Sequence, residues 1–154
     1  PHKFALGAHK RQDSVINGIA AVQSSCEIVS IQDGARPCTS SALISKTIAV
    51  AREVGAAVAS HKVTDTIKIS DSQNKIVRNV NRTHLWAVQT PQVFRLKVIR
   101  EALAAVRQQG VTVTDDTAAC ELIGQAVSLI LSKSHNPKIT TPADLPLIEL
   151  LLRQ

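Results

Sequence analysis

The sequence predicts an α/β fold in which a mainly parallel sheet is flanked by helices and carries a projecting β-arm. The sheet is predicted because segments with apolar residues at helical spacing alternate along the chain with short apolar runs. The arm is predicted because two neighbouring strand-like segments leave one face polar and are joined by a polar turn. We therefore expect a single domain over residues 1–154, with the arm at about 63–82.

The first part of the chain shows this alternation clearly. Val15, Ile19 and Val22 stand at helical spacing, and either Asp13 or Ser14 is available to cap the helix that they define. The segments expected here are a helix at 11–23, a strand at 27–31, a helix at 41–55 closed by Gly55, and a strand at 56–60.

The arm comes next and interrupts the alternation. Residues 63–70 and 75–80 are its two strand-like segments, and Asp71–Asn74 forms the polar turn between them. A two-stranded ribbon is only marginally stable alone, so we expect the arm to pack against another surface. A second subunit is one candidate for that surface.

The alternation returns after the arm. We expect Asp115 and Asp116 to serve the dipole of a short helix, and Thr141 and Pro142 suit the cap and first position of the last helix. The segments expected here are a strand at 85–89, a helix at 95–110 closed by Gly110, a helix at 114–124, a strand at 126–131 and a helix at 141–154.

The charge of the chain favours a small anionic ligand over a nucleic acid. The formal net charge is +6 and the sequence pI is about 9.6, but aromatic residues make up only 2% of the chain. Proteins that bind single strands rely on aromatic stacking platforms, and the Lys and Arg residues here are spread along the chain. A basic surface that attracts phosphorylated substrates explains the charge equally well.

The cysteines indicate the redox environment of the protein, and the apolar runs indicate whether it could span a membrane. Three scattered cysteines, Cys26, Cys38 and Cys120, fit a reducing environment in which they act as small apolar residues. The longest apolar runs are far too short to span a bilayer, so no membrane partner is expected. The chain starts at Pro1 and has no methionine, which suggests a fragment of a longer protein.

Polar side chains gather after several apolar runs. Asp33 and Arg36 follow 27–31, Thr90 and Gln92 follow 85–89, and Asn136 and Lys138 follow 126–131; these are the predicted site positions. Loops at the carboxyl ends of strands converge in open α/β sheets, and these residue types suit a phosphate. A carboxylate in such a cationic site is explained by a bound Mg²⁺. The alternative is that these are ordinary polar residues of loops and turns that bind no ligand.

Six stretches carry a resemblance to a known family: RQDSVINGI, DGARP, VTDTIK, NRTHLWAVQTPQVF, VTDDTAACELIG and NPKITTPADL. Their order and spacing resemble those of the 2-C-methyl-D-erythritol 4-phosphate cytidylyltransferase family over nearly the whole chain. The combination of DGARP with LWAVQTPQVF is specific to this family resemblance. The resemblance implies a Rossmann-like nucleotidyltransferase fold, CTP, methylerythritol phosphate and Mg²⁺ as reactants, a role in non-mevalonate isoprenoid biosynthesis, and a homodimer with exchanged arms.

The resemblance also implies roles for individual residues. Asp33 resembles the carboxylate that binds the metal, and Arg36 resembles the residue that orients the methylerythritol phosphate. Thr90 and Lys138 would hold the substrate phosphate, with Thr114 beside them. Asp33, Arg36 and Lys138 are the expected catalytic residues.

Three further positions match substrate-binding residues of the family. Ser14 would contact the cytosine, and Thr66 and Arg82 on the arm would reach the active site of the neighbouring subunit. Each hydroxyl also has a structural interpretation: Ser14 and Thr114 suit helix caps, and Thr66 suits a plain β-strand.

The sequence departs from the family pattern in three places, of which the third is milder. The family begins with a strand and a glycine-rich loop that cradles the triphosphate; residues 1–154 contain no such segment, so the chain is expected to be N-terminally incomplete, and it can be inactive alone while its parent is an enzyme. Ala8 and His9 stand where the family has a glycine and a small or acidic residue, and Gln32 stands where a histidine is common.

Two alternatives to the leading function stay open. A ribitol-5-phosphate cytidylyltransferase shares the QTPQ and NPKITTP stretches, and a truncated, non-catalytic homologue would bind phosphate without turnover. The expected location is a bacterial cytoplasm, with a plastid as the alternative.

Overall fold

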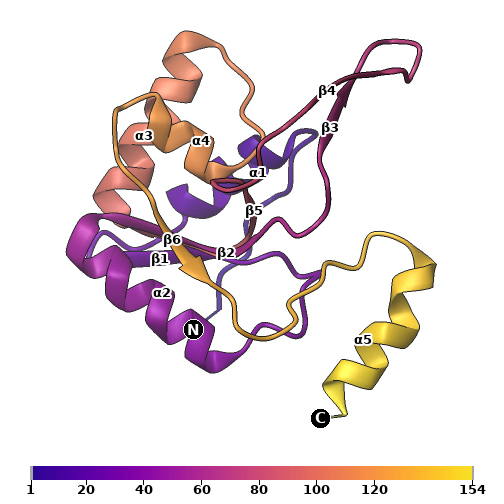
Figure 1. The fold of residues 1–154 in the computed structure, drawn as a ribbon. Coiled ribbons are helices and arrows are strands. Elements are labelled where there is room, and N and C mark those ends of the chain that lie inside the picture. The colour runs from indigo at the N-terminus through magenta and orange to yellow at the C-terminus, as the bar shows by residue number, and fades with distance from the viewer. Residues whose placement is uncertain (1, 154) are drawn as a thin grey trace.

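The computed structural model describes residues 2–153 and contains a four-stranded mixed sheet. The strands are β1 (Ile28–Ile31), β5 (Trp86–Arg95), β2 (Ala56–Lys62) and β6 (Ser128–Leu131), in that spatial order. Strand β5 runs antiparallel to β1 and β2, whereas β2 and β6 are parallel. Three of the four strands therefore share one direction (Figure 1).

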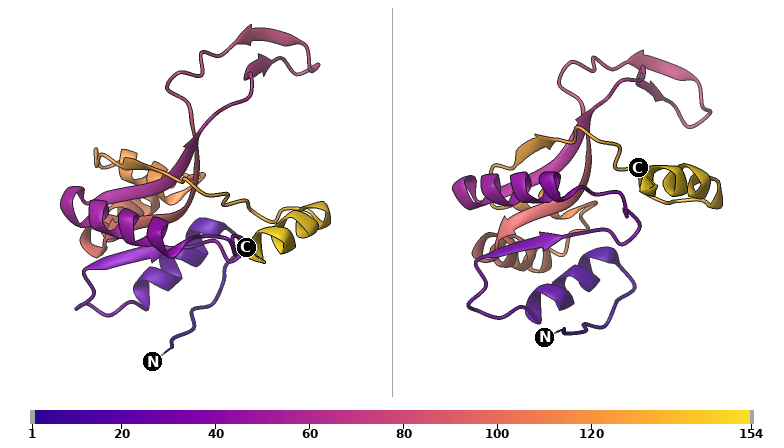
Figure 2. Two further views of the ribbon diagram at one scale, coloured as in Figure 1. Left: turned by 60° about the horizontal axis from the view of Figure 1, so that its bottom comes forward. Right: turned by 90° about the horizontal axis from the view of Figure 1, so that it is seen from below.

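Helices cover both faces of the sheet (Figures 1 and 2). The α2 helix (Ser41–Val54) lies on one face, and α1 (Arg11–Ala20), α3 (Leu96–Gln109) and α4 (Asp116–Glu121) lie on the other. Alternating residues of each strand supply the two cores, as the two-residue period of a strand requires. Val93 packs in the α2 core, and its neighbour Phe94 packs with α1, α3 and α4; both are fully buried.

Strand β5 is the main departure from the expected elements. It was expected to end at residue 89 but continues to Arg95. Proline within a strand is normally confined to edges and bulges because it lacks an N–H donor. Pro91 lies at an irregularity in the pairing with β2, between Val58, which is opposite Gln92, and Ser60, which is opposite Val88. This bulge lets a central strand contain a proline.

The extension of β5 corrects the expected position of two site residues. Thr90 and Gln92 were expected in a loop that follows a strand, but both lie inside β5 and are 3% exposed. They reach the other site residues because β1 pairs with this part of β5, with Ile31 opposite Gln92. The loop after β1 therefore begins beside the middle of β5.

The helix ends agree with the sequence expectations in part. Gly55 (φ +99°) and Gly110 (φ +64°) follow α2 and α3 with the left-handed backbone that glycine tolerates. Pro142–Asp144 form a short 3₁₀ helix, and α5 (Leu145–Leu152) follows it. Ser14 does not cap α1, because that helix begins at Arg11 and Ser14 lies within it. Asp115, rather than Thr114, caps α4.

The arm is present and extends the β2–β5 pair. Lys62 is opposite Trp86 at the end of that pair, and the chain then continues into β3 (Lys68–Ser70) and β4 (Ile76–Asn79). These two strands pair only with each other and project well beyond the sheet (Figure 2). Ile76 and Val77 are 68% and 61% exposed, so the arm leaves apolar side chains uncovered.

None of the helices in residues 2–153 combines the length and the apolar character needed to cross a membrane.

Candidate functional site

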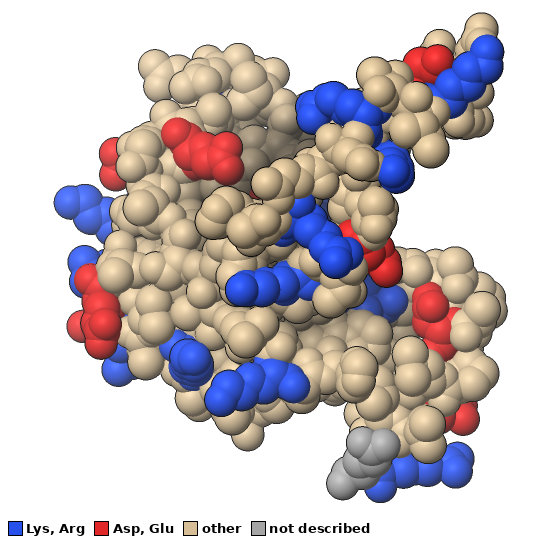
Figure 3. Space-filling view, viewed as in Figure 1, with Lys and Arg blue, Asp and Glu red and all other residues tan. Residues whose placement is uncertain are grey.

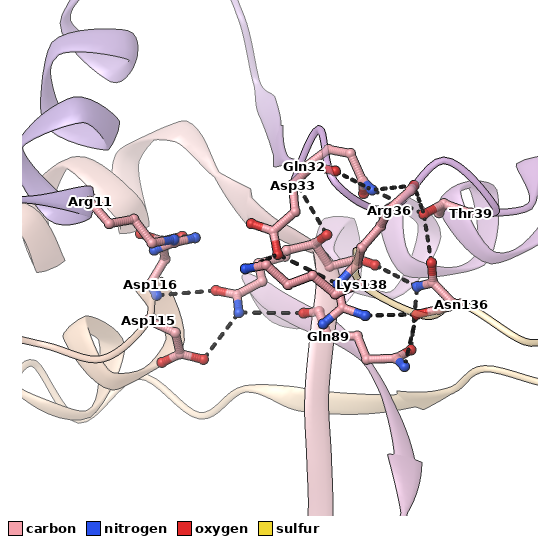
Figure 4. A network of polar contacts seen from close by, with 12 residues as sticks. Arg11, Gln32, Asp33, Arg36, Thr39, Gln89, Asp115, Asp116, Asn136 and Lys138 are labelled. Carbon is pink, nitrogen blue, oxygen red and sulfur yellow. Dashed lines mark hydrogen bonds and ion pairs between the residues drawn. The ribbon is translucent and has the colours of Figure 1, made fainter. Parts of the chain in front are cut away.

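The candidate site is centred on Asp33, in the loop that follows β1 (Figure 4). The Asp33 carboxylate lies 3.1 Å from Nζ of Lys138 and 3.5 Å from Nε of Arg36, both measured to Oδ2. Its backbone N–H donates to Oγ1 of Thr90 across 3.1 Å. The structure thus brings together four of the predicted site residues from three separate parts of the chain.

The net charge of this cluster is positive. One carboxylate faces a guanidinium and an ammonium, and their side chains are 19%, 12% and 44% exposed for Asp33, Arg36 and Lys138. Nε of Arg36 is buried and makes no hydrogen bond to the described residues. The nearest acceptor, Oδ2 of Asp33 at 3.5 Å, is too far away for a good hydrogen bond, so the guanidinium keeps capacity for a further acceptor. The cluster is therefore suited to an anion with several oxygens, such as a phosphate.

Asn136 holds the loops of the cluster together. Its side chain is 3% exposed, and Nδ2 donates to the Thr90 carbonyl across 2.9 Å. Its backbone carbonyl accepts from Nη1 of Arg36 at 2.7 Å, and its Oδ1 accepts from Oγ1 of Thr39 at 2.9 Å. Asn136 thus fixes the arginine and places Lys138, two residues later. It was predicted to lie in the cluster, but its positioning role was not, because that role depends on contacts distant in sequence.

A second polar network lies beside the cluster, at the start of α4 (Figure 4). Gln92 donates from Nε2 to Oδ2 of Asp115 across 3.0 Å, and its Oε1 accepts from the Asp116 backbone N–H at 3.1 Å. Nη2 of Arg11 donates to Oδ2 of Asp116 at 2.7 Å. Asp115, which was expected to serve the helix dipole, caps the helix, with Oδ1 accepting from the Ala118 N–H at 2.9 Å. Asp116 instead pairs with Arg11.

Burial governs the ionisation of this pair. Loss of hydration raises the pKa of Asp116, and the hydrogen bond and positive charge of Arg11 offset that rise only partly. The hydrogen bond to Asp116 raises the pKa of Arg11 in turn. The raised pKa of Asp116 favours a neutral carboxyl group, whereas the raised pKa of Arg11 favours a charged guanidinium. We assign an ionised Asp116 at neutral pH, because a 2.7 Å contact with a guanidinium is typical of a carboxylate.

The remaining predicted residues lie outside the Asp33 cluster. Oγ of Ser14 accepts from the Ala8 N–H at 2.8 Å, so this hydroxyl organises the segment that precedes α1. Thr114 is exposed and lies directly before the cap of α4. Thr66 and Arg82 are exposed on the arm, where the Arg82 guanidinium donates to the Thr64 carbonyl. Within one chain the structure does not bring these four residues into the cluster.

Two cavities help to locate the site. One of about 520 Å³ borders the cluster at Gln89 and Asn136 and also contacts Lys62 at the base of the arm. A larger one, of about 630 Å³, lies at the opposite end of β1, between Glu27 and Arg95. The larger cavity is distant from Asp33, so its size does not make it the functional site.

The residues described here do not include a cluster of three or more His, Cys, Asp or Glu side chains that could hold a metal ion. The Asp33 carboxylate nevertheless fits a Mg²⁺ site of a particular kind. Mg²⁺ is commonly held by one or two carboxylates, with substrate phosphates and waters completing its coordination. Oδ2 of Asp33 faces the two cations, which leaves Oδ1 as the oxygen for a metal.

Comparison with known proteins agrees with the resemblance. The family profile described as IspD, 2-C-methyl-D-erythritol 4-phosphate cytidylyltransferase, matches residues 3–154. A relative with that enzyme name from Caldanaerobacter subterraneus subsp. tengcongensis is 43% identical over all of this chain and 68% of its own length. One from Alkaliphilus oremlandii is 43% identical over 96% of this chain and 62% of its own length.

Solved structures show the same fold. The crystal structure of the Thermus thermophilus enzyme of that name superimposes with a TM-score of 0.87 and 35% identity, over 96% of this chain and 71% of that one. The chain thus spans roughly two thirds of the length of these three relatives, from 62% to 71%. The profile match over nearly every residue, together with this superposition, places the chain in the 2-C-methyl-D-erythritol 4-phosphate cytidylyltransferase family.

Proposed function

We propose that this protein transfers a cytidylyl group from CTP to 2-C-methyl-D-erythritol 4-phosphate and releases pyrophosphate, a step of isoprenoid precursor biosynthesis. Family membership supports the reaction. The observation that carries it in this chain is the placement of Asp33 between Lys138 and Arg36, whose buried Nε lies 3.5 Å from the carboxylate and makes no hydrogen bond to the described residues. The relatives named above favour methylerythritol phosphate over ribitol 5-phosphate as the acceptor.

The reaction requires positioning and charge neutralisation rather than a covalent intermediate with the protein. An oxygen of the sugar phosphate forms a bond to the α-phosphorus of CTP, while the bond from that phosphorus to the β-phosphate oxygen breaks and pyrophosphate leaves. Arg36 and Lys138 are placed to bind phosphate oxygens and to stabilise the charge that develops on them. The hydroxyls of Thr90 and Thr114 would add hydrogen bonds to the substrate phosphate.

Asp33 would hold Mg²⁺ through its carboxylate, which fits the single-carboxylate site described above. When bound, Mg²⁺ would neutralise the triphosphate and polarise its phosphoryl oxygens. Arg36 and Lys138 lie beside this carboxylate, where they would bind oxygens of the sugar phosphate.

We also infer a homodimer in which each arm completes the partner's site. The arm exposes Ile69, Ile76 and Val77, and a second subunit that covered these apolar side chains would remove them from water. Thr66 and Arg82 lie on this arm, away from the Asp33 of their own chain. Figure 3 shows Lys and Arg side chains along the arm and on the body beneath it, as expected for a site that gathers anionic substrates.

A bacterial cytoplasm is the location that we propose. The three free cysteines fit a reducing compartment. A relative of the same enzyme name from Oryza sativa is described as chloroplastic, so a plastid is the alternative.

The function is tested by incubating the full-length parent of this chain with CTP, Mg²⁺ and either methylerythritol phosphate or ribitol 5-phosphate, and measuring pyrophosphate release. We expect release with methylerythritol phosphate and little with ribitol phosphate. A preference for ribitol phosphate would contradict the proposed acceptor. Calorimetric binding of methylerythritol phosphate without pyrophosphate release would instead identify a non-catalytic phosphate-binding homologue.

A further inference from the structure

The first turn of α1 is joined to the segment before α4 by a row of polar contacts. Nε2 of Gln12 donates to the Val111 carbonyl at 3.4 Å, and Oε1 of the same side chain accepts from the Val113 N–H at 3.0 Å. Lys10 donates to Oγ1 of Thr112 across 3.2 Å. The Arg11–Asp116 ion pair completes the row, and it is the contact that reaches the buried interior.

Asp116 is the buried end of this row. Its side chain is 1% exposed, whereas that of Arg11 is 40% exposed. Oδ1 of Asp116 is buried without a hydrogen-bond partner among the described residues, so Arg11 is its main compensation. Removing one partner of such a pair leaves the other desolvated charge uncompensated. The position of α1 is therefore tied to the presence of this carboxylate.

Gln92 connects the same row to the Asp33 cluster. Its amide binds both the Asp115 carboxylate and the Asp116 N–H, and the side chain is 3% exposed. Thr90, two residues earlier on β5, accepts from the Asp33 N–H. The chain of contacts therefore runs from α1, through α4 and β5, to Asp33 (Figure 4).

We propose that Arg11, Gln92 and Asp116 are positioning residues that set Ser14 and Thr114 relative to the Asp33 cluster. Ser14 lies one helical turn after Arg11, and Thr114 lies two residues before Asp116. Neither of these substrate-binding residues contacts Asp33 directly, so their placement depends on the elements that carry them. This inference rests on the proposed function, which supplies the roles of Ser14 and Thr114.

The test compares Asp116→Asn with Arg100→Ala in the intact protein. Asparagine keeps the shape of Asp116 but removes the charge that holds Arg11. Arg100 donates from Nη2 to the Val22 carbonyl at 3.1 Å, just beyond the other end of α1, so its loss loosens the same helix away from the site. The measurements are the KM for CTP, the KM for methylerythritol phosphate, CTP affinity by calorimetry, and the melting temperature.

We expect Asp116→Asn to weaken CTP affinity and raise the KM for CTP about tenfold, which corresponds to about 1.4 kcal/mol. Arg100→Ala should lower the melting temperature without changing the KM for CTP. A lower melting temperature for Asp116→Asn with unchanged CTP affinity would mean a structural role only and would overturn the inference.

A second variant keeps the test decisive if Asp116→Asn does not fold. Arg11→Gln combined with Asp116→Asn removes both charges and keeps a hydrogen-bonding pair, so we expect it to fold and to recover part of the CTP affinity. Recovery of folding with CTP affinity and KM values equal to those of the unaltered protein would also overturn the inference. Absence of CTP binding by the unaltered protein would instead contradict the proposed function itself.

Discussion

Asn136 and Thr90 are 46 residues apart in sequence, yet the Asn136 side chain donates to the Thr90 carbonyl across 2.9 Å in the buried floor of the site. This contact joins the loop that follows β6 to the bulged strand β5. Because the same asparagine also binds Arg36 and Thr39, one residue determines where three site segments meet.

Replacing Asn136 with alanine should therefore destabilise the fold and reduce activity together. Loss of the amide removes the donor to the buried Thr90 carbonyl, which typically costs about 1–3 kcal/mol, whereas the Thr39 hydroxyl keeps its contacts with the Arg36 carbonyl and Gln32. Urea unfolding measures this change. Asn81→Ala is the matched control, because the exposed Asn81 side chain binds only Thr83 within its own turn, and a change below about 0.5 kcal/mol is expected there.

Lys138→Ala should weaken the binding of the sugar phosphate. A charge-assisted hydrogen bond contributes roughly 1.5–3 kcal/mol, so the KM for methylerythritol phosphate should rise about 10- to 100-fold. Lys46→Ala provides the control, because Lys46 is exposed on α2, away from the loops that carry the site. Equal effects of the two substitutions would show that only the general positive charge matters.

Cys120 should resist thiol reagents in the folded protein. Burial, followed by the negative charges of Asp116 and Asp115, raises the pKa of its thiol to about 12. The reactive thiolate is therefore scarce near neutral pH, and the side chain is fully buried. Titration with a disulfide reagent at about pH 8, near the ordinary thiol pKa, should modify at most two of the three cysteines in the native protein and all three after unfolding. Rapid modification of Cys120 in the native protein would contradict its burial.

Asp144 should make the start of the last helix sensitive to acid. Hydrogen bonds from the backbone N–H groups of Thr140 and Thr141 lower the pKa of its carboxyl to about 2. Because the folded pKa lies below the unfolded value of about 3.9, the carboxylate stabilises the fold above that value. This contribution is lost as the pH falls through about 2.

Asp144→Asn should consequently be less stable than the unaltered protein at neutral pH, and the two should converge between about pH 4 and pH 2. Urea unfolding at several pH values measures the difference. A stability gap that stays constant down to about pH 2 would show that the carboxylate charge does not contribute.

The arms provide a test of the shared site. Arg82→Ala and Asp33→Ala should each inactivate a homodimer. In a mixed dimer one site would carry both substitutions and the other neither, so equal mixing should restore activity in about a quarter of the sites. If the subunits are shown to exchange and activity stays absent, Arg82 does not act on the partner's site.

The sequence predicted the local features of this fold better than the distant contacts. Gly55 and Gly110 marked the ends of α2 and α3, because a left-handed backbone leaves a clear signal in the residue type. The Asp33 loop was also predicted, since DGARP follows an apolar strand. Strand β5 was cut short because Pro91 normally ends a strand, and only its pairing with β2 reveals the bulge that accommodates it.

The second polar network could not be predicted for a related reason. Arg11 and Asp116 are 105 residues apart, and nothing in either local sequence distinguishes this buried pair from exposed charges at helix starts. Gln92 was placed in the site region but in a loop, whereas it lies inside β5, where its amide reaches Asp115 and Asp116. Contacts of this kind depend on the packing of α1, α4 and β5 together.

The most direct test of the central claim follows the reaction by phosphorus NMR, with CTP, methylerythritol 4-phosphate and Mg²⁺. The account predicts that pyrophosphate and a new cytidine diphosphate ester of the sugar appear in equal amounts. Both should disappear in Asp33→Ala, while Asp71→Ala on the arm turn retains the reaction. Hydrolysis of CTP without the diphosphate ester, or ester formation that survives the loss of Asp33, would contradict the account.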